Sequence, residues 1–159
     1  MPEFTHIDQQ GSVRMVDVTP KDATLRTANA RATVDMQPET LQKILDKRVK
    51  KGNVLETARI AGIMAAKKTA ELIPMCHPLN LTHVNIDFEL DEDRHRIQIE
   101  AGVRLVGQTG VEMEALSAVA ISALTIYDMC KSYDREIIIT DVYLAEKTGG
   151  KSGTFTKVK

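Results

Sequence analysis

The chain has little of several features that define other protein classes. Its 159 residues include no tryptophan and only two cysteines, Cys76 and Cys130. That is too few for a disulfide framework, so we expect free thiols and a cytoplasmic location. The formal net charge is only −1, which gives no basic field for nucleic acid. No apolar run approaches the roughly 20 residues of a membrane span, and the N-terminal MPEFTHIDQQ lacks a signal-peptide core. We therefore expect neither a nucleic acid nor a membrane as a partner.

Alternating apolar and polar residues predict most of the strands. This period of two is clear over residues 28–36, 84–90 and 97–105, as in strands with one covered face. The predicted order is strands at 14–18 and 28–36, helices at 38–49 and 54–72, strands at 84–90 and 97–105, a helix at 110–132 and a strand at 136–144.

This order predicts one α+β domain over residues 1–159, with an antiparallel sheet covered by helices. Its latter part, helix-strand-strand-helix-strand, resembles the ferredoxin-like pattern. We expect the N-terminus, about residues 1–12, and the C-terminal tail, about residues 147–159, to be flexible.

The predicted helix at 110–132 contains no charge between Ala115 and Tyr127. A helix that is apolar all round is buried on all sides, more than one small sheet usually covers, so we expect an oligomer interface. Charged residues stand only near its two ends, with Glu112 and Glu114 in the first turns and Asp128 and Lys131 in the last.

These terminal charges allow two interpretations, and both remain open at this point. The helix dipole favours Glu112 and Glu114 at the start but disfavours Asp128 at the end. Lys131 lies three residues after Asp128, so the two form either a local ion pair or an acid–base couple tuned by partial burial. Glu114 and Asp128 are 14 positions apart, which is roughly 21 Å along a helix. If both serve the same pocket, either the ligand is long or two subunits build the site, and we expect a site shared at a subunit interface.

The loop LIPMCHPL is bracketed by prolines, which restrict their own φ and the residue before them. It holds Met75, Cys76 and His77, and its stiffness suits a segment that binds a ligand without reorganising. His77 is equally a candidate ligand donor and a structural hydrogen-bonding residue. Because Cys76 and His77 are adjacent and the acidic residues lack metal-ligand spacing, no metal site is predicted.

Lysines and glycines supply candidates for anion binding. Lys51 stands near a helix start, where backbone N–H groups are free, and Lys67 stands in the helix that follows, although most such charges are solvated. The segment AEKTGGKSG, residues 145–153, ends like a P-loop, but Ala145 replaces its first glycine and too few residues follow for a helix. It is therefore either a flexible cationic tail or a mobile segment, carrying Lys147, that closes over an anionic substrate.

Five blocks together resemble the MoaC family, the cyclic pyranopterin monophosphate synthases of molybdenum cofactor biosynthesis: MVDVT, GNVLETARIAGIMAAKKT, LIPMCHPL, TGVEMEALSAVAISALTIYDMCK and KTGGKSG. The resemblance runs from Thr5 to Gly153. It implies a ferredoxin-like subunit in a homo-hexamer, a trimer of dimers with sites at the dimer interface. It also implies a lyase-type reaction, in which a cyclised dihydro-GTP made by a radical SAM partner enzyme becomes cyclic pyranopterin monophosphate with release of pyrophosphate.

The resemblance also implies roles for residues. Asp128 and Lys131 would be the acid–base pair. The pterin and ribose site would be lined by Met75, Cys76, His77, Met113 and Glu114. The triphosphate or a proton transfer would involve Lys51, Lys67 and Lys147, with Glu112 and Arg26 completing the substrate-binding set.

No cofactor is required by this assignment, and Mg²⁺ can accompany the substrate triphosphate. The rival hypothesis is a non-catalytic oligomeric nucleotide-binding or regulatory protein. Such a protein would keep the basic residues but would not need the acid–base couple of Asp128 and Lys131.

Overall fold

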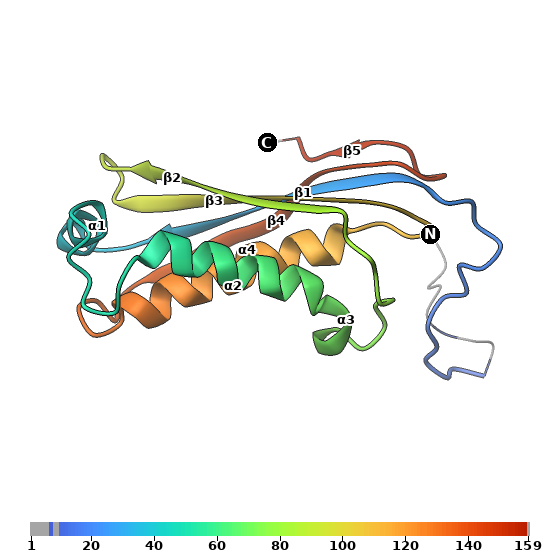
Figure 1. The fold of residues 1–159 in the computed structure, drawn as a ribbon, viewed down its shortest axis with the longest axis horizontal. Coiled ribbons are helices and arrows are strands. Elements are labelled where there is room, and N and C mark those ends of the chain that lie inside the picture. The colour runs from blue at the N-terminus through green and yellow to red at the C-terminus, as the bar shows by residue number, and fades with distance from the viewer. Residues whose placement is uncertain (1–6, 8–9, 159) are drawn as a thin grey trace.

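The computed structural model describes residue 7 and residues 10–158 (Figure 1). Its elements are β1 (Thr24–Asp35), α1 (Pro38–Leu45), α2 (Val54–Lys67), α3 (Thr69–Leu72), β2 (His83–Asp91), β3 (Arg96–Gly107), α4 (Glu112–Cys130), β4 (Ile138–Thr148) and β5 (Phe155–Thr156). The strands form one sheet in the order β2-β3-β1-β4-β5, and all neighbours pair antiparallel.

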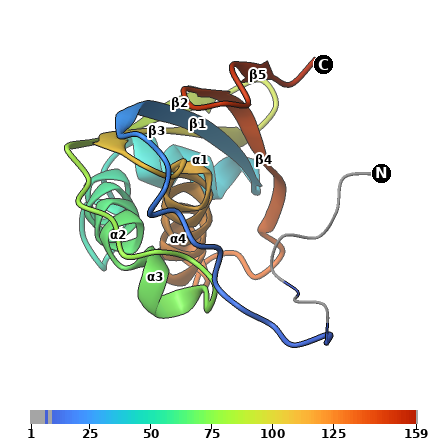
Figure 2. The same cartoon turned by 90° about the vertical axis from the view of Figure 1, so that its right-hand side faces the viewer.

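The two long helices lie against the same face of the sheet, with α2 beside α4 (Figures 1 and 2). Without the short elements α1, α3 and β5, the order is β-α-β-β-α-β. The prediction of an α+β domain with an antiparallel sheet and helices on one face is therefore confirmed.

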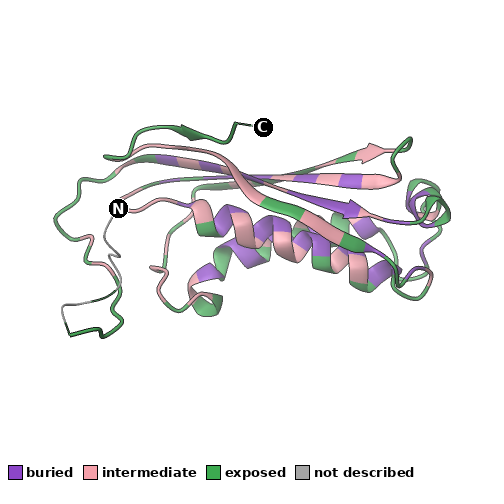
Figure 3. Ribbon diagram, turned by 180° about the vertical axis from the view of Figure 1, so that it is seen from behind, coloured by how far each residue is buried: buried purple, intermediate pink, exposed green. Residues whose placement is uncertain are grey.

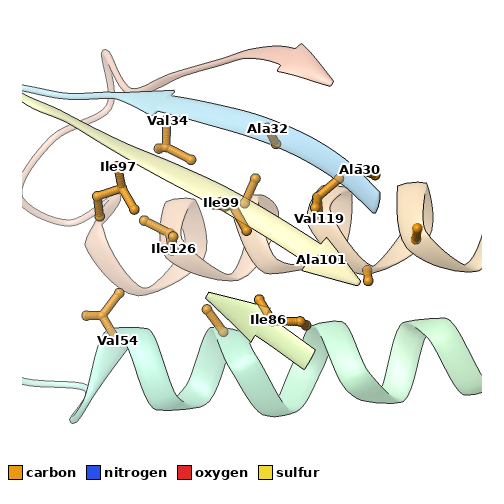
Figure 4. Packing of buried hydrophobic residues seen from close by; sticks show 14 of the residues in the cluster. Ala30, Ala32, Val34, Val54, Ile86, Ile97, Ile99, Ala101, Val119 and Ile126 are labelled. Atoms are coloured by element: carbon orange, nitrogen blue, oxygen red, sulfur yellow. The ribbon is translucent and has the colours of Figure 1, made fainter. Parts of the chain in front are cut away.

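The core forms where the apolar faces of the sheet and helices meet (Figure 4). Ala30, Ala32 and Val34 of β1 alternate with more polar residues and are almost completely buried. They pair with Ala101, Ile99 and Ile97 of β3, so the period of two in each strand places two apolar rows against α4. Small residues along β1 leave room for the larger side chains that α4 inserts, including Val119 and Ile126.

Helices α2 and α4 approach each other closely because small side chains face the contact. A Cβ on Gly62 of α2 would collide with the Ser122 hydroxyl and with Ile86. Ser122 is fully buried and donates a hydrogen bond to the Ala58 carbonyl at 3.0 Å. Packing of this kind fixes the position of α4, which carries candidate site residues near both ends.

The predicted burial of α4 on all sides is wrong for this chain taken alone. Its sheet-facing side is buried, but the far side is partly accessible (Figure 3), and Leu124 is 53% exposed. By length and composition α4 is also the one helix among the described residues that would suit a membrane span. Half of the relevant window is nevertheless buried inside the fold, as in the core helix of a globular domain.

Several elements differ from the sequence predictions. The expected strand at 14–18 is absent, and next to this segment Val13 forms an isolated bridge with Ile7. The first helix ends at Leu45 rather than 49, and the chain turns at Lys47, whose φ is 56°. The helix expected over 54–72 is divided at Lys68 into α2 and α3.

The C-terminal segment, expected to be a flexible tail, contains a short strand. Strand β4 continues through Lys147 to Thr148, and the chain then reverses so that Phe155 pairs with Lys147 and Thr156 with Glu146. A tail expected from its glycines is therefore a hairpin around residues 149–154. Most of the N-terminal segment expected to be flexible, residues 1–6 and 8–9, lies outside the described residues.

Candidate active site

The start of α4 lies beside the end of β4, and this brings Glu112 and Lys147 together. Lys147 Nζ donates to Glu112 Oε1 at 2.7 Å, and both side chains are 28% exposed. The pair borders a cavity of about 220 Å³. The cavity is lined by Lys21, Arg26, Thr27, Gln108, Thr109, Gly110, Glu112, Lys147, Thr148, Gly149 and Ser152. Cations outnumber carboxylates in this wall, so the cavity suits an anion.

A second cavity, of about 360 Å³, shares the wall made by Lys21, Gly110 and Glu112. Its other side is the proline-bracketed loop, and the residues that the sequence placed around the pterin all line it: Met75, Cys76, His77, Met113 and Glu114. A third hollow, of about 350 Å³, contains Lys67 and meets the second at Leu79 and Glu114. The three form one chain of cavities along the start of α4, cationic at the Lys147 end, more apolar in the middle, and lined by Lys67 together with Glu71 and Glu114 at the other end.

Glu114 is the most perturbed acid of this cleft. It is only 4% exposed, and burial, reinforced by the negative charge of Glu112, raises its pKa to about 7. Burial and the charge of Glu114 likewise raise the pKa of the Cys76 thiol, which therefore stays protonated near neutral pH. A carboxyl with a pKa near 7 can both hold and release a proton under ordinary conditions. The sequence placed Glu114 in the site but gave no sign of this pKa.

His77 is held by the N-terminal segment. Its Nε2 lies 2.8 Å from the Val16 carbonyl oxygen, and because a carbonyl only accepts, this nitrogen carries the proton. The contact explains why residues 14–18 do not form a strand: Val16 and Val18 are wall residues of the second cavity. His77 thus makes the structural hydrogen bond that one interpretation expected, and it also lines the second cavity; when Nε2 carries the only ring proton, Nδ1 is an acceptor.

A second cluster lies near the far end of α4. Asp128 Oδ1 accepts from Lys131 Nζ at 2.8 Å, and its Oδ2 lies 3.1 Å from Lys51 Nζ. Lys51 Nζ also donates to the backbone carbonyl of Asp128 at 2.7 Å. The sequence grouped Lys51 with Lys67 and Lys147, but the structure places it with Asp128 instead.

The expected partial burial of the Asp128–Lys131 couple is wrong for the isolated chain. Their side chains are 58% and 52% exposed. The hydrogen bond from Lys131, followed by that from Lys51, lowers the pKa of Asp128, while the bond to Asp128 raises the pKa of Lys131. Both shifts favour the charged forms of the pair.

The two clusters cannot meet within one chain. Helix α4 runs without a break from Glu112 to Cys130, so the 14 positions between Glu114 and Asp128 correspond to roughly 21 Å. The structure thus brings one group of predicted residues together at the start of α4: Arg26, Lys67, Met75, Cys76, His77, Glu112, Met113, Glu114 and Lys147. Asp128, Lys131 and Lys51 form the other.

Several residues of the cleft were not identified from the sequence. Lys21 lines the first two cavities, and Thr109 and Gly110 form the wall between them. Lys21 stood in a segment predicted to follow a strand, and no motif distinguished it from a surface lysine. Among the described residues, no group of three or more histidine, cysteine or acidic side chains could hold a metal ion.

Fold and site define a class of protein: a small α+β domain whose cleft offers cations for a polyanion and a carboxyl for proton transfer. The model of the MoaC family matches residues 15–150, and this chain belongs to that family. It is 66% identical over 155 residues to the cyclic pyranopterin monophosphate synthase of Desulforapulum autotrophicum, covering 98% of this chain and 95% of the relative. A protein of the same name from Desulfatibacillum aliphaticivorans is 59% identical, and the match covers 98% of this chain and 98% of the relative. Another, from Pelotomaculum thermopropionicum, is 58% identical, and the match covers 99% of this chain and 92% of the relative.

Proposed function

We propose that this chain catalyses the formation of cyclic pyranopterin monophosphate from a cyclised dihydro-GTP, with release of pyrophosphate, in molybdenum cofactor biosynthesis. The observation that carries the proposal is the identity of 58–66% over nearly the whole chain to relatives named for this synthase. The cleft at the start of α4 supports it, because it joins a cationic cavity to an apolar one beside a carboxyl with a pKa of about 7.

In this proposal the cationic cavity receives the triphosphate. Lys147 would contact its oxygens together with the backbone N–H groups of the glycine hairpin. The adjoining cavity would receive the pterin and ribose between the Met75–His77 loop and Met113. Mg²⁺ that travels with the substrate would be held mainly by the phosphates, and no redox cofactor takes part.

Glu114 and the Asp128–Lys131 couple would share the proton transfers. Glu114 is poised near neutral pH within the cleft, whereas Asp128 and Lys131 are a tight ion pair at the surface. Docking a second subunit over this exposed pair would remove water and move both pKa values toward neutrality, since burial disfavours charged forms. The accessible side of α4, with Leu124, supplies an apolar surface for such contact.

We infer from this that the active site is shared between subunits of a ferredoxin-like homo-oligomer, a trimer of dimers. One subunit would contribute the cleft at the start of its α4, and another would contribute Asp128, Lys131 and Lys51. The separation of the two clusters within one chain is the observation that motivates this arrangement.

The experiment is a coupled assay with GTP and the radical SAM cyclase that makes the substrate. Wild type should yield cyclic pyranopterin monophosphate and pyrophosphate, and Asp128→Asn, with an unchanged circular dichroism spectrum, should yield neither. Failure of wild type to form product while it still binds the nucleotide would support the rival hypothesis, a nucleotide-binding regulatory protein.

Mixing inactive subunits tests the shared site. Consider a mixed dimer of one Asp128→Asn subunit and one Lys147→Ala subunit. Each site takes its cleft from one subunit and its Asp128 from the other, so one of the two sites would carry both substitutions and the other would carry neither. Random mixing in equal amounts should therefore restore about a quarter of wild-type activity, by the symmetry of a two-fold interface. No recovery, with mixed oligomers demonstrated by mass spectrometry, would refute the shared site.

A further inference from the structure

Arg26 occupies an unusual position for a residue that binds substrate. Arg26 lies on β1, on the helix-facing side of the sheet, and only 9% of its surface is exposed. Among the described residues no carboxylate forms an ion pair with it. Its guanidinium instead donates to two backbone carbonyls, from Nε to Gly107 and from Nη2 to Gln108, both at 3.3 Å. Gly107 ends β3, and Gln108 begins the loop that leads into α4 and Glu112.

The other side of the same guanidinium lies against the glycine hairpin. A Cβ added to Gly150 would collide with Nη1 of Arg26, and one added to Gly149 would collide with the Leu25 carbonyl and approach Arg26 Cδ to 3.1 Å. Both glycines have positive φ, 97° at Gly149 and 74° at Gly150. The hairpin can therefore rest on Arg26 only because these positions lack side chains.

Arg26 thus contacts one segment next to each partner of the Glu112–Lys147 ion pair. The loop at Gly107 and Gln108 precedes Glu112, and the hairpin at Gly149 and Gly150 follows Lys147. We propose that Arg26 is a positioning residue: it clamps the hairpin to the loop before α4 and thereby sets Glu112 and Lys147 at hydrogen-bonding distance across the anion cavity. The effect of this assignment on turnover rests on the proposed function. The effect on the position of the hairpin does not.

The hairpin contains its own control. Gly153 has a φ of 65°, close to that of Gly150, but a Cβ there meets no atom within 4 Å. Alanine at Gly153 carries only the cost of a left-handed backbone, whereas alanine at Gly150 carries that cost and the collision with Arg26. The difference between the two variants isolates the contact.

The first readout is trypsin cleavage after Lys151, which lies between the two glycines. Arg26→Ala and Gly150→Ala should speed this cleavage about tenfold over wild type and clearly more than Gly153→Ala, as expected when the packing contact between the hairpin and Arg26 is lost and the hairpin opens more often. Arg26→Lys should not restore slow cleavage. The planar guanidinium of arginine contacts the two carbonyls and the hairpin at the same time, and the compact ammonium group of lysine cannot do so. The double variant Arg26→Ala/Gly150→Ala should be no faster than Arg26→Ala alone.

The second readout is the dissociation constant for inorganic triphosphate, measured by calorimetry. Gly150→Ala should weaken binding about tenfold although it removes no charge, a loss comparable to one charged hydrogen bond, and in the coupled assay it should raise KM more than it lowers kcat. If Arg26 only contacted the phosphate, the results would differ. Arg26→Ala would weaken triphosphate binding without changing the rate of cleavage, and Gly150→Ala would have the same cleavage rate and dissociation constant as Gly153→Ala. That result would overturn the positioning role, whereas an inactive wild type with the expected cleavage pattern would overturn only the proposed function.

Discussion

Replacing Glu114 by glutamine should remove a pH-dependent loss of stability from this protein. Glu114 is 4% exposed, and burial raises its pKa from an ordinary 4.5 to about 7. The folded chain therefore keeps this proton over a pH range in which the unfolded chain has released it. A carboxyl of this kind does not lower the free energy of unfolding below pH 4.5, where it is protonated in both states. It lowers that free energy progressively as the pH rises from 4.5 through about 7.

The size of the effect follows from the two pKa values. A difference of 2.5 between 4.5 and about 7, at 1.36 kcal/mol for each pH unit, gives at most about 3 kcal/mol. Because the carboxyl faces a cavity that water can enter, screening reduces this figure, and we expect about 2 kcal/mol. Glu114→Gln should thus equal wild type in stability at pH 4 and exceed it by about 2 kcal/mol at pH 8.

Urea unfolding between pH 4 and pH 9, at one fixed protomer concentration, measures this directly. Glu89→Gln is the control for the chemical change, since Glu89 lies on the exposed side of β2. Parallel stability curves for wild type and Glu114→Gln would refute the argument, and so would a variant that is less stable than wild type at pH 8.

Three further predictions follow from contacts described above. Lys147→Ala should lower turnover by about 100-fold or more, as when one charge-stabilising donor is removed, while the circular dichroism spectrum stays unchanged; near-normal product formation would contradict it. Gly62→Ala should lower the free energy of unfolding by about 1–3 kcal/mol, because its Cβ collides with Ser122 and Ile86, and an unchanged denaturation midpoint would count against that packing. Ile126→Ala, at a fully buried position of α4, should cost about 2–5 kcal/mol in the same experiment, and a cost below about 1 kcal/mol would show that the core closes over the gap.

The sequence predicted the sheet well where one face of a strand is covered. Val84 to Leu90 and Ile97 to Leu105 alternate strictly, and both segments are strands. It failed at residues 14–18, where RMVDV has the composition of a strand. Whether such a segment pairs depends on a free sheet edge nearby, and Val16 meets His77 instead. Strand β5 was missed for the converse reason, since two residues after a glycine turn carry too short a pattern to detect.

The members of the candidate site were easier to predict than their properties. The blocks around His77, Glu112 and Lys147 named residues that the fold brings into one cleft. The pKa of Glu114 and the position of Lys51 depend on distances that no local pattern encodes. Asp128 shows the same limit: apolar neighbours in sequence predicted burial, but Met129 and Cys130 point into the core while Asp128 points away from it.

The uninterrupted course of α4 constrains how this protein can change. Its 19 residues join the cleft to the Asp128 cluster as one rigid rod. Inserting a single residue between them would lengthen the rod by about 1.5 Å and rotate one end against the other by about 100°. A change in the length of this helix therefore alters the direction and spacing of every group at the far end together. Variation in this family should therefore accumulate in the hairpins and termini, while the number of residues in α4 stays constant.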